Sequence, residues 1–489
     1  MNIQNRRECF FDDYLINMEK TTAEFVLHQP QRKETVMVFD KPWEGDHCGD
    51  ICILHDGEKY IMYYVAQNLR NVNHDDSDTN EYYNCYATSV DGIHWERPNL
   101  GRFDYKGSIE NNIIDSMNTT GHAMYSVFID TNPDCPPDEK YKALRSRVGD
   151  FYIRQLKAYV SADGIDFKEK YLVEDGGYYD TMNLAFWDDI AKKYRCYTRG
   201  FHAPAGYKDG EELDFFHPST AEIRIRDIRY LESQDFVNWT ESRRIDMGDV
   251  EDIELYTNQA IPYYRAPHMI LAFPTRYNGR KVWTKNYDIL PDLDAREERS
   301  RGEKRYGLAL TDCAFMVSRD GENFTRYEDA FLKPGPECPG SWVYGDCYPA
   351  YGVFETKSDI PGADNELSVF VGEGHWNGEP TRLARYTIRL DGFVSLHAGG
   401  KKEEIIVTKP FIFEGKNLYA NISTSARGYM YFTLKAKDGT TVKSCEIFGD
   451  KTDRFIPIDE GNMEELSGKE VVMEIRLRDA DIYSIRFGE

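Results

Sequence analysis

Short apolar runs alternate with polar turns along most of the chain, at the spacing expected of β-strands. Near the start, runs at 51–54, 59–65 and 83–89 follow one another, and Asp56-Gly57 separates the first two. Short apolar runs bounded by Gly and Asp predict antiparallel strands joined by tight turns. Helical periodicity is nearly absent, which disfavours folds that alternate strands with helices. We therefore predict an all-β fold.

A Ser-x-Asp-x-x-x-aromatic unit recurs through most of the chain. Its first copy is Ser89-Val-Asp91-Gly-Ile-His-Trp95, and further complete copies occupy 161–167, 233–239 and 318–324. A partial copy, Arg389-Leu-Asp391-Gly-Phe393, follows at a similar interval. Each copy is preceded by two further strand-like runs, and small sheets repeated at a near-constant period are typical of β-propellers. The repeat predicts a five-bladed β-propeller over residues 1–398.

The pattern changes after Leu396, where shorter alternating runs such as 429–436 and 471–477 are separated by turns such as Asp438-Gly439. This pattern predicts a β-sandwich over residues 399–489. Two runs near the beginning of the chain, at 8–15 and 25–39, are expected to pair with the last blade and close the ring.

Charge and cysteine usage narrow the possible partners and the compartment. The formal net charge is −24, which disfavours nucleic acid and anionic lipid as partners. No run is long and apolar enough to span a membrane, and residues 1–22 lack the uninterrupted apolar segment of a signal peptide. The ten cysteines show no metal-ligand spacing. We expect a cytoplasmic protein with free thiols, no metal and no cofactor.

Aromatic residues make up 14% of the chain, including 34 Tyr and 26 Phe. Most of them are expected to pack within the strands, where flat rings fit a pleated surface. The same residues suit stacking on sugar rings, so the composition is compatible with a carbohydrate ligand.

The first predicted inner strand carries a resemblance to a known group of enzymes. The segment from Asp50 to Gly57, followed by a Tyr-rich strand, resembles the opening of the furanosidase-type five-bladed glycoside hydrolases of families 43 and 32. The similarity extends over residues 40–396, and the C-terminal part resembles the sandwich behind family 32 propellers. It is nearest to uncharacterised bacterial family-32-like proteins, whose motifs match residues 11–15, 42–44, 273–276 and 390–393.

The chain also departs from those families. The Trp-Met-Asn-Asp-Pro-Asn-Gly opening and the Glu-Cys acid motif of family 32 are absent, and Asp50-Ile51 stands where family 43 has Asp-Pro. The resemblance implies a glycoside hydrolase that cleaves a small carbohydrate substrate with paired carboxylates, and it leaves the identity of the sugar and of the acid open.

Five carboxylates fall where blade geometry brings chain segments to one face near the axis. Asp50 heads the first inner strand and is predicted to be the nucleophile or base, with Glu44 as its rival. Asp180 heads the third inner strand, where the resemblance implies an Asp that tunes the acid and orients the sugar. Glu373 ends a second strand and is predicted to be the acid, in competition with Glu254, which holds the family's usual acid position. Glycoside cleavage needs one protonated and one ionised carboxyl.

Other polar and aromatic residues at similar positions are candidates for substrate binding. Arg199 either holds an anionic substrate group or pairs with Asp180, and the histidines and the asparagine are hydrogen-bonding groups. The full set is Arg199, Arg276, His122, His202, His268, Asn183, Trp43 and Trp376.

The sequence leaves two other functions open. A glycoside phosphorylase would need a basic cluster to hold phosphate, for which Arg199, Arg276 and His202 are available. A non-catalytic carbohydrate-binding propeller would lack a facing carboxyl pair. The charged loops at 203–220 and 277–306 are predicted to form a lid or the contact of a homo-oligomer.

Overall fold

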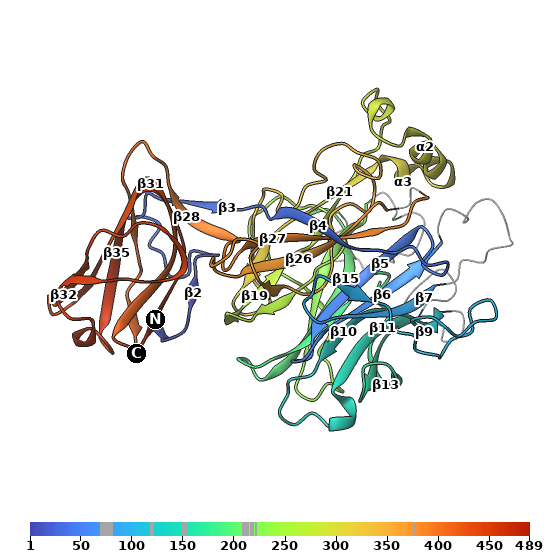
Figure 1. Cartoon of the computed structure of the whole chain (residues 1–489), viewed down its shortest axis with the longest axis horizontal. Coiled ribbons are helices and arrows are strands. Elements are labelled where there is room, and N and C mark those ends of the chain that lie inside the picture. Colours follow the sequence, from blue (N-terminus) through green and yellow to red (C-terminus); the bar gives the residue numbers. More distant parts are fainter. Residues whose placement is uncertain are drawn as a thin grey trace.

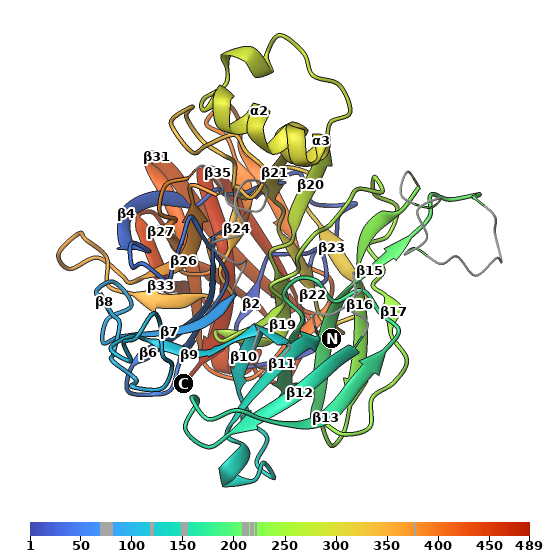
Figure 2. The same cartoon turned by 90° about the vertical axis from the view of Figure 1, so that its right-hand side faces the viewer.

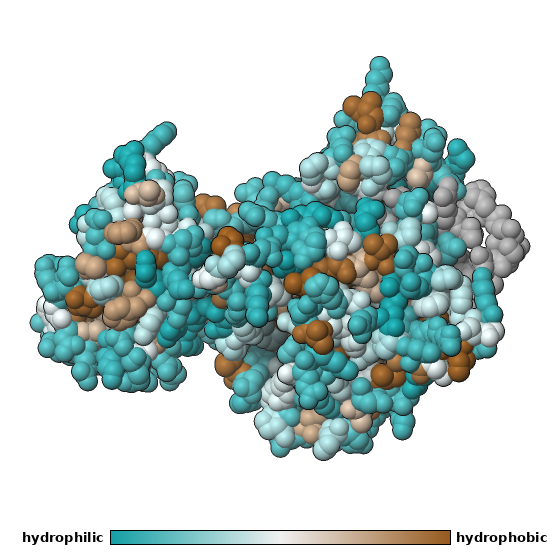
Figure 3. All heavy atoms as spheres, viewed as in Figure 1, coloured by the Kyte–Doolittle hydropathy of each residue, from teal (hydrophilic) through white to brown (hydrophobic). Residues whose placement is uncertain are grey.

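The computed structural model of the protein describes residues 1–68, 82–117, 122–147, 155–207, 215, 220, 223–375 and 378–489. It consists of two lobes, a ring of small sheets and a second all-β lobe that contains both termini (Figure 1). The surface seen in Figure 3 is largely hydrophilic, and the molecule narrows between the lobes. None of the described helices is long and apolar enough to cross a membrane.

Five antiparallel sheets form the blades of a propeller, as the repeat predicted. Figure 2 shows blades two and three in the foreground and the helical excursion α2 (Leu293–Gly302) and α3 (Lys304–Leu308) at the top. Blade one comprises β5 (His47–His55), β6 (Tyr60–Gln67), β7 (Tyr83–Ser89) and β8 (Trp95–Glu96), with β9 (Ile113–Ser116) beside β7. Blade two comprises β10 (His122–Ile129), β11 (Tyr141–Arg147), β12 (Gln155–Ser161) and β13 (Lys168–Asp175).

Blades three to five follow the same plan. Blade three comprises β14 (Leu184–Asp188), β15 (Lys193–His202), β16 (Ile225–Ser233) and β17 (Arg243–Arg244). Blade four comprises β18 (Ile261–Tyr263), β19 (Ala266–Ala272), β22 (Met316–Ser318) and β23 (Phe324–Arg326), and its hairpin β20 (Thr275–Gly279) and β21 (Ala309–Cys313) leads to the helices. Blade five comprises β24 (Tyr348–Pro349), β25 (Phe354–Thr356), β26 (Glu366–Glu373), β27 (Arg382–Arg389) and β4 (Gln31–Val38).

The repeated Ser-x-Asp units are the turns at the outer edge of the blades. In blade two, Asp163 accepts hydrogen bonds from the Ile165 and Asp166 amides, both at 2.9 Å, and from Ser161 Oγ at 2.9 Å. The Gly164 carbonyl that follows accepts a hydrogen bond from Tyr63 Oη of blade one at 2.7 Å. The equivalent turn of blade four bonds Tyr197 of blade three in the same way. In blades two and four the turn is therefore tied to the neighbouring blade as well as held by its own local hydrogen bonds.

The N-terminal segment serves both lobes. Strand β4 pairs with β27 and completes blade five, as expected for part of the 25–39 run. The expectation for residues 8–15 is wrong, because β2 (Glu8–Cys9) pairs with β35 (Glu470–Gly488) of the second lobe. Its neighbours Phe10 and Leu15 are buried in the apolar core of that lobe, and this burial decides the partner.

The C-terminal lobe is the β-sandwich that the sequence predicted. Its long strands β31 (Asn417–Ala436) and β35 pair over most of their length. The other strands of this sheet are β1 (Asn2–Gln4), β3 (Glu24–Leu27), β28 (Val394–Ala398), β29 (Glu404–Val407), β30 (Phe411–Phe413), β32 (Thr441–Ser444), β33 (Asp450–Phe455) and β34 (Ile458–Glu460). Asp391, from the partial fifth repeat, lies fully buried between the lobes and pairs with Arg7 and Arg265.

Candidate active site

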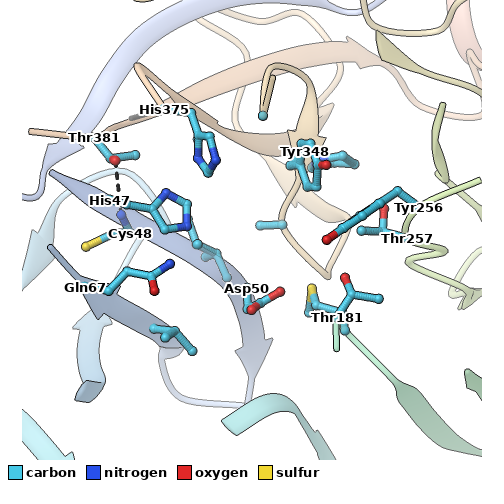
Figure 4. A pocket seen from close by; sticks show the side chains of 18 of the residues that line it. His47, Cys48, Asp50, Gln67, Thr181, Tyr256, Thr257, Tyr348, His375 and Thr381 are labelled. Atoms are coloured by element: carbon cyan, nitrogen blue, oxygen red, sulfur yellow. Dashed lines mark hydrogen bonds between the residues drawn. The ribbon is translucent and has the colours of Figure 1, made fainter. Parts of the chain in front are cut away.

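A cavity of about 290 Å³ lies at the axis of the ring and is lined from blades one, three, four and five (Figure 4). Its lining includes two of the carboxylates predicted from the sequence, Asp50 and Asp180. The remaining lining is mostly tyrosine, threonine, glutamine and histidine. A cavity at the low end of the ligand-pocket size range, with a few converging polar groups, is the expected form of a small-molecule site.

Asp50 reaches the cavity from an irregular point in the innermost strand of blade one. The register of β5 against β6 jumps from Gly49↔Val65 to Cys52↔Tyr63, and Asp50 adopts a positive φ of 47°. Such bulges turn a side chain away from the regular alternation and concentrate at functional sites. The Asp50 carboxyl consequently points into the cavity in Figure 4.

The environment of Asp50 favours its protonated form. Burial, and secondarily the negative charge of Asp180, raise the pKa of Asp50 to about 7. Among the described residues, no side chain or amide donates a hydrogen bond to its carboxyl that would favour ionisation. Asp50 can therefore carry a proton near neutral pH.

Asp180 is presented by a tightly held loop that leads into blade three. Arg199 pairs with its carboxylate through Nη1 and donates from Nε to the Tyr178 carbonyl at 3.1 Å. Asn183 donates to the Thr181 carbonyl at 2.7 Å, which fixes the turn next to Asp180. The Asp180 side chain remains 46% exposed. The sequence left two roles open for Arg199, binding of an anionic substrate group or pairing with Asp180, and in the structure it pairs with Asp180. Asn183 holds the loop in place.

Two histidines of the cavity were not predicted. The His47 and His375 rings meet edge to face with centroids 4.0 Å apart. A Cβ at Gly345 would lie 2.1 Å from the His375 ring, so glycine is required there. Burial lowers the pKa of His47 to about 3, and burial and His47 lower that of His375, so both rings are neutral at pH 7. A single histidine gives no local sequence signal. His47, however, begins the first inner strand, and a position at the start of an inner strand is the criterion that pointed to Asp50.

The rest of the polar lining offers hydrogen-bonding groups suited to hydroxyls. Gln67 is buried, and its Oε1 atom has no hydrogen-bond partner among the described residues. Six other groups lie at or just before the start of an inner strand, where the sequence could have revealed them: Thr181, Tyr256, Thr257, Gln259, Tyr344 and Tyr348. Tyr82 and Thr381 lie just before third strands.

Glu44 and Glu254 do not line this cavity. Glu44 is fully buried within blade one, where it accepts hydrogen bonds from Tyr64 Oη at 2.6 Å and from Arg97 Nε at 2.8 Å. Glu254 pairs with Arg226, whose guanidinium lies 5.3 Å from the Tyr256 ring centroid. Both acids have a cation as their partner, and neither is among the residues that line the axial cavity.

Glu373 faces the opposite side of β26 from the axial cavity. Its carboxylate receives two hydrogen bonds from Arg32, both at 2.8 Å, and one from Tyr386 Oη at 2.9 Å. The adjacent Gly372 does line the axial cavity. Side chains alternate between the two faces of a strand, so a shift of one residue moves a side chain from the face toward the axial cavity to the opposite face.

The remaining predicted binding residues are held by structural contacts away from the cavity lining. Arg276 pairs with Asp312, Trp43 donates to Asn112, and His268 lies beside Glu8. His202 lies between Asp227 and Asp252; burial alone would lower its pKa, but hydrogen bonds to these carboxylates raise it overall. Trp376 and the side chain of His122 lie outside the described residues. In the described part of the chain, no three His, Cys, Asp or Glu side chains converge as metal ligands would.

No protein-family model matches the chain, and no curated protein matches it. Among solved structures, it is similar to an N-acetylgalactosamine deacetylase from F. plautii, with 12% identity, 76% of this chain and 95% of that chain covered, and a TM-score of 0.42. It is also similar to a member of the GH130 family of mannoside phosphorylases, in which glycoside hydrolases target β-1,2 mannosidic linkages (14% identity, 75% and 96% covered, TM-score 0.42). A third is a family 43 arabinoxylan arabinofuranohydrolase from Bacillus subtilis (13% identity, 93% and 99% covered, TM-score 0.40).

Proposed function

We propose that the protein is a glycoside hydrolase that acts on a small glycoside in the axial cavity. The observation that carries this proposal is the pair Asp50 and Asp180, which line one cavity from two blades in contrasting environments. Asp50 is desolvated and favours its proton, whereas Asp180 is paired with Arg199 and partly exposed. A protonated carboxyl beside an ionised one is what glycosidic bond cleavage requires.

The roles follow from the two environments. Asp50 donates its proton to the glycosidic oxygen as the bond to the leaving group breaks. Asp180, ionised, stabilises the positive charge that develops on the sugar or activates the attacking water. From the sequence we predicted Glu373 as the acid and Asp50 as the nucleophile or base. The proposal now assigns the role of acid to Asp50.

The cavity size and lining favour recognition of one neutral sugar ring. A volume of about 290 Å³ suits a small ligand. Gln67 Oε1 offers an acceptor to a hydroxyl, and tyrosines such as Tyr256 and Tyr348 offer both hydroxyls and ring faces. These features support cleavage of a terminal sugar from a short substrate.

Phosphorolysis is disfavoured because no cationic side chain of the described residues lines the axial cavity. None of the described residues that line it is Lys or Arg, and its two histidines are neutral at pH 7. We therefore expect turnover without inorganic phosphate and no stimulation when phosphate is added.

Kinetics with two kinds of leaving group test the proposal. A panel of aryl and alkyl glycosides, furanosides included, would identify a substrate through the released sugar. Asp50→Asn is expected to lower kcat/KM about 10²–10⁴-fold for poor leaving groups and much less for an activated aryl group, which needs no proton. Asp180→Asn is expected to lower the rate with both.

The matched control is Asp56→Asn, at the opposite end of the same hairpin, where Asp56 accepts turn amides. It should retain wild-type rates. Wild-type rates in Asp50→Asn on a poor leaving group would contradict the assignment, and so would equal losses in Asp56→Asn.

A further inference from the structure

A second cavity, of about 510 Å³, lies on the other side of β26 from the axial cavity. Val371 and Glu373 line it, whereas Gly372 lines both cavities because it has no side chain between them. Its opposite wall is the loop from Phe331 to Ser341. We call this space the blade-five cavity. None of its side chains has a part in the proposed reaction.

The blade-five cavity carries excess positive charge in a chain whose net charge is −24. Arg32, Lys333 and Arg382 line it, and Glu373 is hydrogen-bonded to Arg32, twice at 2.8 Å. Among the described residues, neither Lys333 nor Arg382 has a carboxylate partner within ion-pair distance. The other acid of the lining, Asp346, is buried, and burial raises its pKa to about 7, so near neutral pH it carries only part of a negative charge.

Arg382 is the better-placed cation. It projects from β27 directly opposite Glu373 of β26 and is half-buried, so it is fixed on a rigid strand. A guanidinium offers two parallel N–H donors that match a carboxylate or phosphate group. An unpaired guanidinium on a cavity wall gains most from an anion that arrives with a ligand.

The rest of the lining suits the body of an organic molecule. The partly exposed Tyr386 ring presents apolar surface, and the loop adds Pro334, Pro336 and Pro339. Proline fixes the backbone of the loop, so the wall is formed before a ligand binds. Tyr386 also donates its hydroxyl to Glu373 and stays oriented.

We propose that the blade-five cavity is a second ligand site, which binds a small organic anion with its carboxylate or phosphate on Arg382 and Lys333. The cavity volume lies within the range of small-molecule sites. The site is separate from the axial cavity and independent of whether the protein cleaves glycosides.

Cys338 provides a built-in reporter for this site. It lines the blade-five cavity and is exposed, while most of the other cysteines are buried. Its alkylation by iodoacetamide, followed by peptide mass spectrometry on the full chain, should slow saturably in the presence of glucuronate or glucose 6-phosphate. Glucose at the same concentration, with ionic strength held constant, should not protect it. Comparing the two anions decides between carboxylate and phosphate.

Variants tie the protection to the proposed cations. Arg382→Gln should raise the half-protecting concentration about tenfold or more, since a charge-assisted bidentate pair is lost. Lys333→Gln, on the exposed loop, should raise it about threefold. Lys357→Gln, which removes an exposed charge elsewhere on blade five, is the control and should leave it unchanged.

Three results would overturn the proposal: no protection by either anion, equal protection by glucose, or unchanged protection in both Arg382→Gln and Lys333→Gln. Thermal unfolding verifies that each variant is folded. If Arg382→Gln does not fold, Lys333→Gln still tests the proposal. Because binding rather than turnover is measured, failure here leaves the glycosidase proposal untouched, and the reverse also holds.

Discussion

The aspartates at the outer turns of the blades and those at the axis are the same residue type in opposite environments. At the turns, desolvation alone would raise the pKa of Asp163, but hydrogen bonds from two backbone amides and a serine hydroxyl together outweigh it and lower the pKa overall. At the axis, Asp50 has no such donors among the described residues, and burial raises its pKa to about 7. The local supply of donors, rather than residue type, separates an aspartate that builds the fold from one suited to proton transfer.

The backbone shows the same contrast. The turn aspartates belong to a regular unit that recurs once per blade, whereas Asp50 occupies a break in strand register with a φ of 47°. The repeated unit therefore marks residues that build the fold, and the break in strand register at Asp50 marks the candidate site.

The largest expected effect is a gain in stability from Asp50→Asn at alkaline pH. Native Asp50 keeps its proton up to about pH 7, while the unfolded chain releases it near pH 4, so the wild type loses stability as pH rises through this window. The loss amounts to at most about 4 kcal/mol. Asp50→Asn should therefore unfold at a higher temperature than wild type at pH 8 and at a similar temperature at pH 4, as measured by calorimetry. If Asp50→Asn had a lower melting temperature than wild type at pH 8, the claim that Asp50 is a desolvated carboxyl would be contradicted.

Removing a turn aspartate should act in the opposite direction. Asp163→Ala leaves the Ile165 and Asp166 amides without their acceptor and should lower stability by about 1–2 kcal/mol, with kcat/KM unchanged. Asp163→Asn keeps an acceptor oxygen and should restore most of the loss. The melting temperatures of the two variants at pH 7 check this, and a large fall in activity with Asp163→Asn would break the distinction between turn and axis.

The smallest effect is expected at Glu373. Glu373→Gln weakens a partly exposed ion pair with Arg32 and should cost less than about 1 kcal/mol, with kcat/KM within about twofold of wild type. Steady-state kinetics on the substrate used for Asp50→Asn make the comparison direct. A loss of about 100-fold or more on a poor leaving group would return the acid role to Glu373.

Local chemistry made much of this molecule predictable. The Ser-x-Asp turns are held by bonds within a few residues, so the sequence displayed one per blade, and Asp50 and Asp180 followed from heading inner strands. Glu373 was misplaced because a one-residue difference in strand alternation decides which side a residue faces. The partner of residues 8–15 depended on burial in a core formed more than 380 residues later, which no local pattern reveals.

The pH dependence of kcat/KM in wild type and Asp180→Asn tests the central claim most directly. If Asp50 is the proton donor, the wild-type rate should fall as pH rises through about 7, because the acid loses its proton. Removing the negative charge of Asp180 lowers the pKa of Asp50, so the residual activity of Asp180→Asn should decline at a lower pH. An alkaline limb that stays in place in Asp180→Asn, or that persists in Asp50→Asn, would contradict the account.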